Sequence, residues 1–256
     1  MEVKDLIVKP ISAADGNRLI RILHYSGKVV PNSQIHLGVF LNGKCGGVLQ
    51  LGPSLDKSKI IGLVKNTKWN EFIELNRMAF ADWLPRNSES RAIGFTLRWL
   101  KKNYPFLKWV ISFADATQCG DGAIYRASGF VLTGINASKN LALLPDGSVI
   151  HKMTLESNPI SPRRELNGKS YYDITGGKYD FAKYIEKVGG NRLVGYQLRY
   201  IYFLDKSYKD KLTIPIIGFD EIKKRGISMY KGERLKQANS SVQEECGGAA
   251  PTRTLQ

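Results

Sequence analysis

Apolar side chains in the first 60 residues recur with periods that predict a strand, a helix and a hairpin in turn. Residues 3–9 are typical of a short strand. Ser12 is placed to cap a helix that runs through Arg21. The pair Asn42-Gly43 lies between two apolar runs, and it favours a type I′ turn because both residues tolerate positive φ. A β-hairpin is therefore expected around residue 42.

Strands and helices continue to alternate as far as residue 155. The pattern predicts a strand over 70–81 that Leu84-Pro85 ends, a helix from about 87–88 to 102, a strand over 108–114, a short helix over 122–128, and strands over 130–135 and 149–155. Within the longer helix, Ile93, Leu97 and Leu100 fall at helical spacing and predict a buried stripe. The first half of the chain is thus an α/β arrangement.

The composition of the chain changes near residue 157, where the segment SNPISPRREL is typical of a linker. The part that follows contains nine of the twelve tyrosines and a long strand-like run over 193–204. The last 20 or so residues are small and polar, which predicts disorder. We therefore expect a core over 1–156, a Tyr/Lys-rich lobe over 157–236 and a disordered tail over 237–256.

The overall composition is that of a globular protein with a strong positive charge. Hydrophobic residues make up 43% of the 256 residues, which excludes disorder of the whole chain. No apolar run approaches 18 residues, so we expect no membrane span. The three cysteines have no spacing typical of a zinc site or a disulfide framework, which favours a reducing cytoplasm.

The formal net charge of +15 is spread over the whole chain. Residues 1–150 contribute 19 basic and 11 acidic side chains, and residues 151–256 contribute 19 and 12. A basic protein accumulates on polyanions because phosphate contacts release counterions. The charge therefore favours nucleic acid as a partner, while a simple solubility effect is the alternative.

The order of the predicted elements resembles that of the GNAT N-acyltransferase fold. Two segments carry the likeness locally, namely the loop and helix start Asn87-Ser88-Glu89-Ser90-Arg91-Ala92 and the segment Ala123-Ile124-Tyr125-Arg126-Ala127-Ser128-Gly129-Phe130. The resemblance implies a mixed central sheet flanked by helices, with the C-terminal lobe as an α+β extension.

The GNAT resemblance also implies a coenzyme A site at the start of the helix near residue 88. Backbone N–H groups at a helix start bind a pyrophosphate through their unpaired donors and the positive end of the dipole. In the family pattern Gln/Arg-x-x-Gly-x-Gly/Ala, Asn87 replaces the first residue, Ser90 replaces the first glycine, and Ala92 matches. The implied donor is acetyl-CoA or a related acyl donor, bound by Arg77, Asn87, Ser88, Ser90 and Arg91.

A narrower resemblance emerges when four segments are considered together. These are His24-Tyr25-Ser26-Gly27-Lys28, 70–77 (NEFIELNR), Asn87-Ser88-Glu89-Ser90-Arg91, and Ser112-Phe113-Ala114-Asp115 with Ile124-Tyr125. In this order and spacing, the chain resembles the Mom DNA-modification family of Mu-like phages over about residues 15–155. The resemblance implies a phage-encoded enzyme of the host cytoplasm and nucleoid that converts adenine in DNA to its N6-carbamoylmethyl form and so protects it from host restriction.

The same resemblance implies that His24, Tyr25, Asp115 and Tyr125 form the catalytic group. The exocyclic amine of adenine is a weak nucleophile and needs a proton acceptor, a role that Asp115 or His24 can fill. A tyrosine such as Tyr125 can protonate a leaving thiolate. Each residue has a structural alternative, because His24 can end a helix, Asp115 can cap one, and the two tyrosines can pack.

Arg77 is unusual because it is placed on one strand face with Ile73 and Leu75. A buried guanidinium needs an anion, which is either Glu74 or Asp82 of this chain or a phosphate or carboxyl of the donor. The sequence leaves a metal site open, since His24, Tyr25 and Asp115 together offer ligands for an ion. His36 and His151 are expected to be solvent-facing strand residues.

The Tyr/Lys-rich lobe interleaves aromatic and basic residues, as surfaces that bind nucleic acid do. The predicted DNA contacts are Lys28, Tyr171, Tyr172, Lys178 and Lys183, and the predicted partner is double-stranded DNA with a flipped adenine. The alternative for these aromatics is the core of the lobe. Two other functions stay open for the chain: an acetyltransferase for a protein or small-molecule amine, and a non-catalytic DNA-binding protein.

Overall fold

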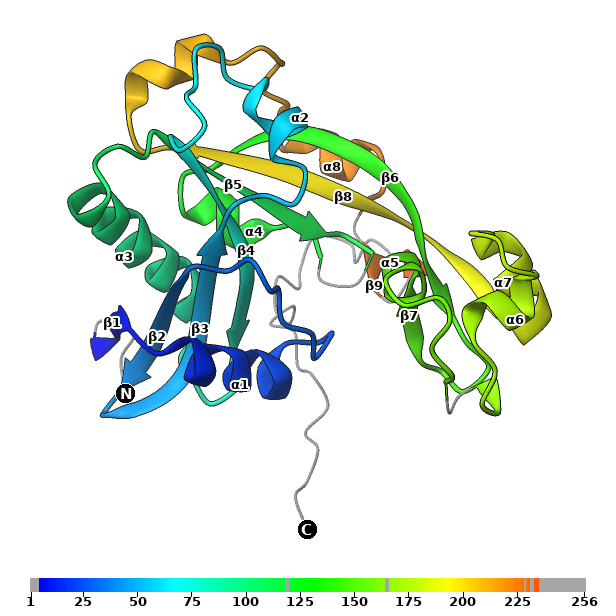
Figure 1. Cartoon of the computed structure of the whole chain (residues 1–256). Helices are drawn as coiled ribbons and strands as arrows, with labels where there is room; N and C mark the ends of the chain where they lie inside the picture. The colour runs from blue at the N-terminus through cyan, green and yellow to red at the C-terminus, as the bar shows by residue number, and fades with distance from the viewer. Residues whose placement is uncertain (1–4, 118–119, 164–165, 228, 231–232, 235–256) are drawn as a thin grey trace.

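A computed structural model describes residues 5–117, 120–163 and 166–227, and the backbone of 229–230 and 233–234. The described part has one sheet of eight strands in the order β1-β2-β3-β4-β5-β8-β6-β7, with helices on both faces (Figure 1). A separate pair is formed by β9 (Met229–Tyr230) and β10 (Glu233–Arg234). The prediction of a mixed central sheet flanked by helices is confirmed.

The first half of the sheet follows the predicted elements closely. Strand β1 (Ile7–Pro10), the hairpin β2 (Ile35–Leu41) and β3 (Lys44–Gly52), and β4 (Phe72–Phe80) pair antiparallel in sequence. Asn42 and Gly43 both have positive φ, as the predicted turn requires. Strand β5 (Trp109–Asp115) then joins β4 in parallel.

Helices cover the two faces of the sheet. Helix α1 (Ala13–Leu23), capped by Ser12, packs on β3 and β4, and the short α2 (Lys57–Ile61) lies farther along the same face. The other face holds α3 (Ser88–Asn103), α4 (Ala123–Ala127) and α8 (Asp220–Lys224). In α3, the predicted stripe of Ile93, Leu97 and Leu100 is buried.

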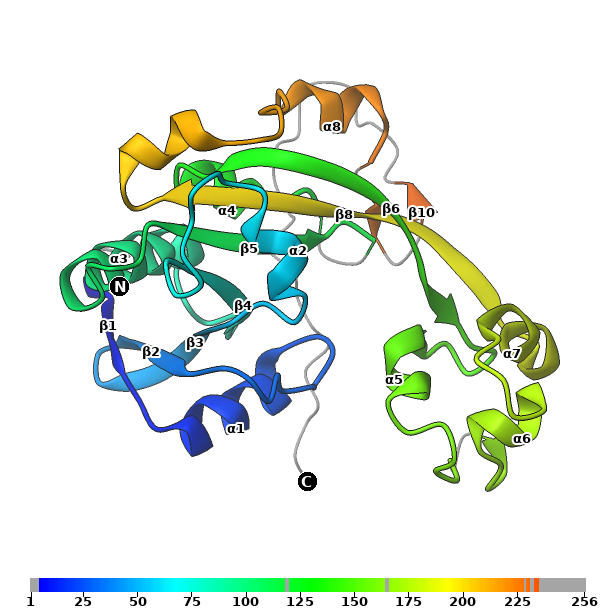
Figure 2. The same cartoon turned by 45° about the horizontal axis from the view of Figure 1, so that its top comes forward.

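The two longest strands leave the core and curve away from it. Strands β6 (Val131–Leu143) and β8 (Asn191–Phe203) have 13 residues each and form a long antiparallel ribbon, visible in Figure 2 as an arch. Strand β8 also pairs with β5 from Trp109 to Asp115. The sheet therefore uses residues from both sides of the predicted boundary at 156, so this boundary does not separate two independent sheets.

The far end of the arch carries a unit with different bounds from the predicted lobe over 157–236, and the name lobe refers to this unit from here on. Its elements are β7 (Val149–His151), α5 (Lys152–Glu156), α6 (Tyr171–Thr175) and α7 (Phe181–Val188). The predicted strand over 149–155 is wrong beyond residue 151, because His151 caps a helix by accepting a hydrogen bond from the Met153 N–H. A 3₁₀ helix, η3 (Lys206–Lys211), follows β8, while the predicted tail over 237–256 lies outside the described residues.

The lobe has a small aromatic core of its own. Tyr171, Tyr184 and Phe181 are buried with Leu155 and Ile185, and the Tyr171 and Tyr184 rings lie 5.4 Å apart between centroids. Burial raises the pKa of Tyr171 to about 12. Because the ring is fully enclosed, its contribution to stability is that of a core aromatic.

We expect Tyr171→Ala to lower the free energy of unfolding by about 3–5 kcal/mol, the usual cost of truncating a buried aromatic. Tyr171→Phe keeps the ring and removes a buried hydroxyl without a hydrogen-bond partner, so it is expected to be nearly neutral. Chemical denaturation measures both values. The exposed Tyr179→Ala is the control, and a loss as large in that variant would contradict the assignment of Tyr171 to the core.

Candidate active site

Strands β4 and β5 stop pairing with each other in the middle of the sheet. Their parallel pairing runs from Phe72–Trp109 to Leu75–Ser112 and stops there. Beyond this point, β4 stays paired with β3 as far as Phe80, and β5 stays paired with β8 as far as Asp115. We call this place the fork. It leaves two adjacent strands diverging, which is where ligands gather in open α/β sheets.

The hydroxyl of Ser112 marks the point at which the fork opens. Its Oγ lies 3.2 Å from the Leu75 carbonyl oxygen and 2.9 Å from Tyr125 Oη. Tyr125 is buried under the α3 face of the sheet, stacked on Tyr200 and edge-on to Phe130. The packing role of Tyr125 is thus present, and its hydroxyl also reaches the base of the fork.

Arg77 lies on the opposite face from the one that its spacing predicts. A bulge in β4 pairs Gln50 with Arg77 and Leu51 with Leu75, so Asn76 is an extra residue that shifts the alternation. Ile73 and Leu75 remain in the core beneath α3, whereas Arg77 lies on the α1 face, with its Nε donating to the Lys28 carbonyl oxygen at 3.3 Å. The prediction of a shared apolar face is therefore wrong.

Glu74 and Asp82 are the predicted anionic partners of Arg77 within the chain, and the charge of Arg77 acts on Glu74. Burial raises the pKa of the Glu74 carboxyl, and the hydroxyl of Ser54 and the charge of Arg77 act against that rise. Arg77 thus faces a partly buried carboxyl on one side and a histidine on the other.

His24 ends α1, which is the structural role expected for it as an alternative to catalysis. It also faces the fork. Its backbone N–H donates to the Ile20 carbonyl oxygen. Its Nδ1 accepts a hydrogen bond from the Ser26 N–H at 3.1 Å, which assigns the proton of the neutral ring to Nε2. Burial, and secondarily the positive Arg77, lower the pKa of His24 to about 4. The ring is therefore neutral at pH 7 and presents a donor.

Tyr25 accompanies His24 at the end of α1. The two ring centroids are 4.3 Å apart, and the Tyr25 side chain is 49% exposed. The pair therefore offers one sheltered imidazole and one accessible phenol at the rim of the site.

Asp115 is the last residue of β5 and projects on the α1 face. Its Oδ1 accepts a hydrogen bond from the Thr117 N–H at 3.0 Å, so it stabilises the turn that follows β5. The structural alternative, a helix cap, is wrong, because the residue that precedes α4 is Gly122. The charge of Asp115 also acts on His151 of the lobe. Asp115 thus stands between the core and the lobe.

His151 is a site residue that sequence reasoning missed. Burial lowers its pKa, while the negative Asp115 raises it and the positive Lys28 and Arg77 lower it further. It is half-buried rather than solvent-facing. No local spacing places it there, because the pairing of β6 with β7 brings it to Asp115, Lys28 and Arg77. His151 joins the site through tertiary structure alone.

Lys28 connects the loop after α1 to the lobe. Its Nζ donates to Thr154 Oγ1 of α5 at 2.5 Å, a contact between residues 126 positions apart. Figure 2 shows α1 and α5 on the same side of the arch. The lobe therefore borders the same face that holds His24, Arg77 and Asp115.

The start of α3 has no side-chain cap. Asn87 precedes it in the left-handed conformation with φ of 69°, and its side chain makes no capping hydrogen bond. Ser88 is buried, with its hydroxyl donating to the Pro85 carbonyl oxygen. The Ser90 hydroxyl donates to the Asn87 carbonyl oxygen at 3.2 Å, so it turns back into its own helix rather than outward. Arg91 lies against the Phe95 ring.

The predicted DNA contacts of the lobe separate into two groups. Tyr171 is fully buried and cannot stack on a base, so this part of the prediction is wrong; the small lobe needs the ring for its core. Tyr172 is half-buried against Tyr179. Lys178 and Lys183 are exposed, although the Lys183 Nζ also donates to the Thr175 carbonyl oxygen.

Among the described residues, no three His, Cys, Asp or Glu side chains gather as a metal ion would require. Within the same residues, no helix combines the length and apolar character needed to cross a bilayer.

The sequence model of the Mom protein family matches residues 5–220, which include both strands of the fork and the lobe. The chain belongs to the Mom protein family. A curated relative of this Mom-family chain, the methylcarbamoylase mom of Escherichia phage Mu, is 41% identical over 155 residues. The match covers 60% of this chain and 63% of the phage protein, so it spans less than two thirds of that relative.

Solved structures that resemble this Mom-family chain are acetyltransferases. The ribosomal-protein-S18-alanine N-acetyltransferase from Escherichia coli is 10% identical, with a TM-score of 0.40, over 78% of this chain and 94% of the other. The IAA acetyltransferase from Bacillus cereus is also 10% identical, with a TM-score of 0.42, over 77% and 99%. Scores this low add no weight to a function.

We expect the stability of the Mom-family chain to depend on pH through His24. Unfolded histidine binds a proton below pH 6.5, whereas folded His24 resists protonation to about pH 4. The contribution of neutral His24 to the free energy of unfolding is complete above pH 6.5. As the pH falls toward 4, this free energy decreases by about 2–3 kcal/mol. Denaturant unfolding at several pH values is expected to show this loss relative to His24→Gln. NMR titration of the His24 imidazole at or above pH 6.5 would contradict it.

Proposed function

We propose that this chain is a transferase that converts adenine in DNA to its N6-carbamoylmethyl form and thereby shields phage DNA from host restriction endonucleases. The observation that carries the proposal is the fork, which gathers a neutral imidazole, a guanidinium and a carboxylate on one face. It does so in a chain of the Mom family whose phage Mu relative is a methylcarbamoylase. The enzyme would act on phage DNA in the host cytoplasm and nucleoid.

Asp115 is the proposed proton acceptor for the N6 amine. The amine shares its lone pair with the purine ring, so it must lose a proton as it attacks. His24 is less suited to this task, because its Nδ1 is already an acceptor for Ser26 and its proton is assigned to Nε2. His24 would instead donate from Nε2, with Tyr25 beside it at the rim.

The donor is proposed to bind along α3 and the α3 face of the fork. The uncapped start of α3 at Asn87 and Ser88 suits the phosphates of an acyl-CoA, since a helix start favours anions. Arg91 would lie close to that charge, and the backbone around Ser90 would contact it. Arg77, on the opposite face, would bind a carboxyl or carboxamide group of the part that is transferred.

Tyr125 would protonate the leaving group from the base of the fork. Its buried hydroxyl contacts Ser112 where the two strands separate, on the side of the sheet on which the donor is proposed to bind. A thioester of acetate reacts at its carbonyl carbon: N6 bonds to that carbon, the C–S bond breaks, and the product is an N6-acetyl amide. The carbamoylmethyl product instead has a methylene on N6 and a carboxamide nitrogen that acetyl-CoA does not contain, so it requires a donor in which a carboxamide-bearing methylene is attached to the leaving group. N6 would bond to that methylene as the leaving group departs with the proton of Tyr125. The two products differ in mass and distinguish the reactions.

Double-stranded DNA with a flipped adenine is the proposed partner. A stacked and paired adenine cannot bring its amine to the fork, so the base must leave the duplex. Lys28 would contact phosphate at the rim, and the exposed Lys178 and Lys183 would do so from the lobe. Such contacts would hold the duplex close to α1 and α5.

Nucleoside mass spectrometry of DNA from expressing cells tests the proposal. We expect N6-carbamoylmethyladenine with the unaltered chain and at least about a 100-fold loss with Asp115→Asn, because the base is removed. The salt dependence of DNA binding should not change. Asp146→Asn, an exposed carboxylate in a turn, is the matched control. Unmodified DNA would favour an acetyltransferase for another amine. Unmodified DNA together with DNA binding and a protective effect that Asp115→Asn leaves intact would favour a non-catalytic DNA-binding protein.

Tyr125→Phe separates the hydroxyl from the ring. The ring contacts with Tyr200 and Phe130 remain, so the melting temperature should change little. We expect modification of DNA to fall by about 10- to 100-fold because the leaving group loses its proton donor. Unchanged modification would leave Tyr125 with its packing role only.

A further inference from the structure

A basic groove lies at the end of the sheet where β4 and β5 begin, away from the fork. It comprises two adjoining hollows, which Lys57 and Lys68 help to line, and the lysine-rich segments 56–71, 101–108 and 205–211 around them. Backbone hydrogen bonds join these segments: Lys65 N–H donates to the Lys211 carbonyl oxygen, and Lys108 N–H to that of Glu71. A hollow of about 770 Å³ opens there and is bordered by Pro53, Leu55, Lys57, Trp69 and Phe106. A second hollow adjoins it at Trp69 and Phe106.

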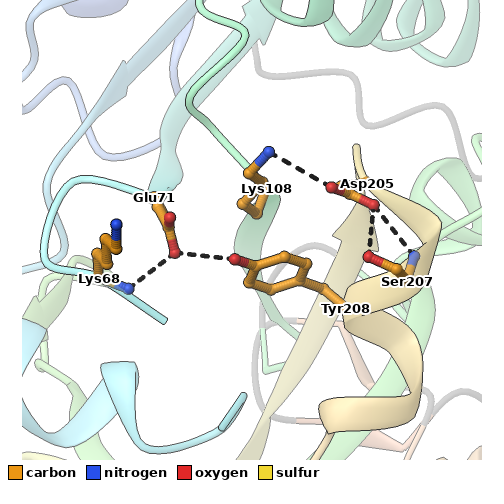
Figure 3. A network of polar contacts seen from close by, with 6 residues as sticks. All are labelled: Lys68, Glu71, Lys108, Asp205, Ser207 and Tyr208. Atoms are coloured by element: carbon orange, nitrogen blue, oxygen red, sulfur yellow. Dashed lines mark hydrogen bonds and ion pairs between the residues drawn. The ribbon is translucent and has the colours of Figure 1, made fainter. Parts of the chain in front are cut away.

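Positive charge is concentrated around this groove. The three segments hold ten lysines and four acidic residues, a net charge of +6 out of the +15 of the whole chain. Three of their four acidic side chains have polar partners within the chain, and that of Asp56 is exposed. Asp56 pairs with Lys59 at 2.7 Å, and two more belong to the network drawn in Figure 3. The surface that a ligand would meet is therefore strongly positive.

The network in Figure 3 holds the floor of the groove together. Glu71 Oε2 accepts hydrogen bonds from the Lys68 N–H at 2.8 Å and from the Tyr208 hydroxyl at 3.1 Å. Asp205 pairs with Lys108 at 3.4 Å and accepts from the Ser207 N–H and hydroxyl. These contacts join the loop before β4 to the start of β5 and to η3, so the groove is a fixed surface.

Large apolar side chains are exposed within the positive surface. Trp69 is 56% exposed, Phe106 is 52% exposed and Leu55 is 81% exposed. Both aromatic residues border both hollows. Lys57 Nζ lies 4.7 Å from the centre of the Trp69 ring. The two exposed rings and the lysines beside them form a surface that is both apolar and positive. Exposed apolar patches of this kind mark interaction sites.

We propose that the basic groove binds single-stranded nucleic acid, with Trp69 and Phe106 stacking on unpaired bases and the surrounding lysines contacting phosphates. The charge selects a polyanion, and the rings select one with accessible aromatic faces. A closed duplex hides its base faces, and an acidic peptide has no bases to stack. The proposal is independent of the proposed reaction at the fork, because binding requires neither donor nor turnover.

The rings are tested with the full chain and a fluorescein-labelled oligothymidylate, by fluorescence anisotropy. We expect the double variant Trp69→Ala, Phe106→Ala to bind about tenfold more weakly or worse, the usual effect of losing base stacking. The single variant Trp69→Phe keeps a ring at this position and should retain most of the affinity of the unaltered chain. Trp83→Ala is the matched control, because Trp83 is 37% exposed beneath Lys44 but lies beyond the other end of β4.

Two comparisons decide between the possible occupants. The binding of a blunt duplex is expected to be insensitive to the ring variant. The double variant Lys65→Gln, Lys68→Gln should lower the salt slope for the single strand by about 1.4, because each lost phosphate contact removes about 0.7. The control Lys187→Gln, Lys223→Gln should leave the slope unchanged. Equal losses for duplex and single strand, or no greater loss than with Trp83→Ala, would overturn the proposal. Polyglutamate is the competitor that tests an acidic protein as the occupant. If it displaces the oligonucleotide from the unaltered chain, and if the ring variant binds the oligonucleotide as tightly as the unaltered chain does, the groove would be assigned to an acidic protein instead.

Discussion

Parallel pairing between β4 and β5 ends after four residues on each strand, and the candidate site is organised around that separation. The backbone of β4 remains bonded to β3 and that of β5 to β8, so both strands stay in place while they diverge. Ser112 bridges the last point of contact. A site on strands held in this way is more rigid than one on loops, which suits chemistry that depends on orientation.

The arch of β6 and β8 brings a second group of residues to the same opening. It carries His151 and Thr154 across the chain to Asp115 and Lys28. The lobe is stabilised by its own buried tyrosines, while its contact with the loop after α1 is polar. The core thus supplies the proposed reacting groups, and the lobe lies beside them.

Local patterns in the sequence were sufficient for most elements of the first half. The spacing of Ile93, Leu97 and Leu100 identified α3, and Asn42-Gly43 identified the hairpin, because each is a short-range signal. The bulge at Asn76 could not be seen, since it depends on the register with β3, and it moved Arg77 to the other face. Tyr171 was mistaken for a surface residue because an aromatic among lysines looks the same in a binding surface and in a small core.

The central position of β8 has a consequence for how the chain is made. Strand β5 ends at Asp115 and β6 ends at Leu143, yet the strand that lies between them begins only at Asn191. During synthesis, β5 and β6 emerge from the ribosome before that segment does. Until it emerges, the backbone N–H and C=O groups that will later bond to it stay exposed. Such non-local closure slows folding and offers unpaired edges to other nascent chains. A ribosome-bound fragment ending before residue 191 would therefore depend on chaperones far more than the finished protein does.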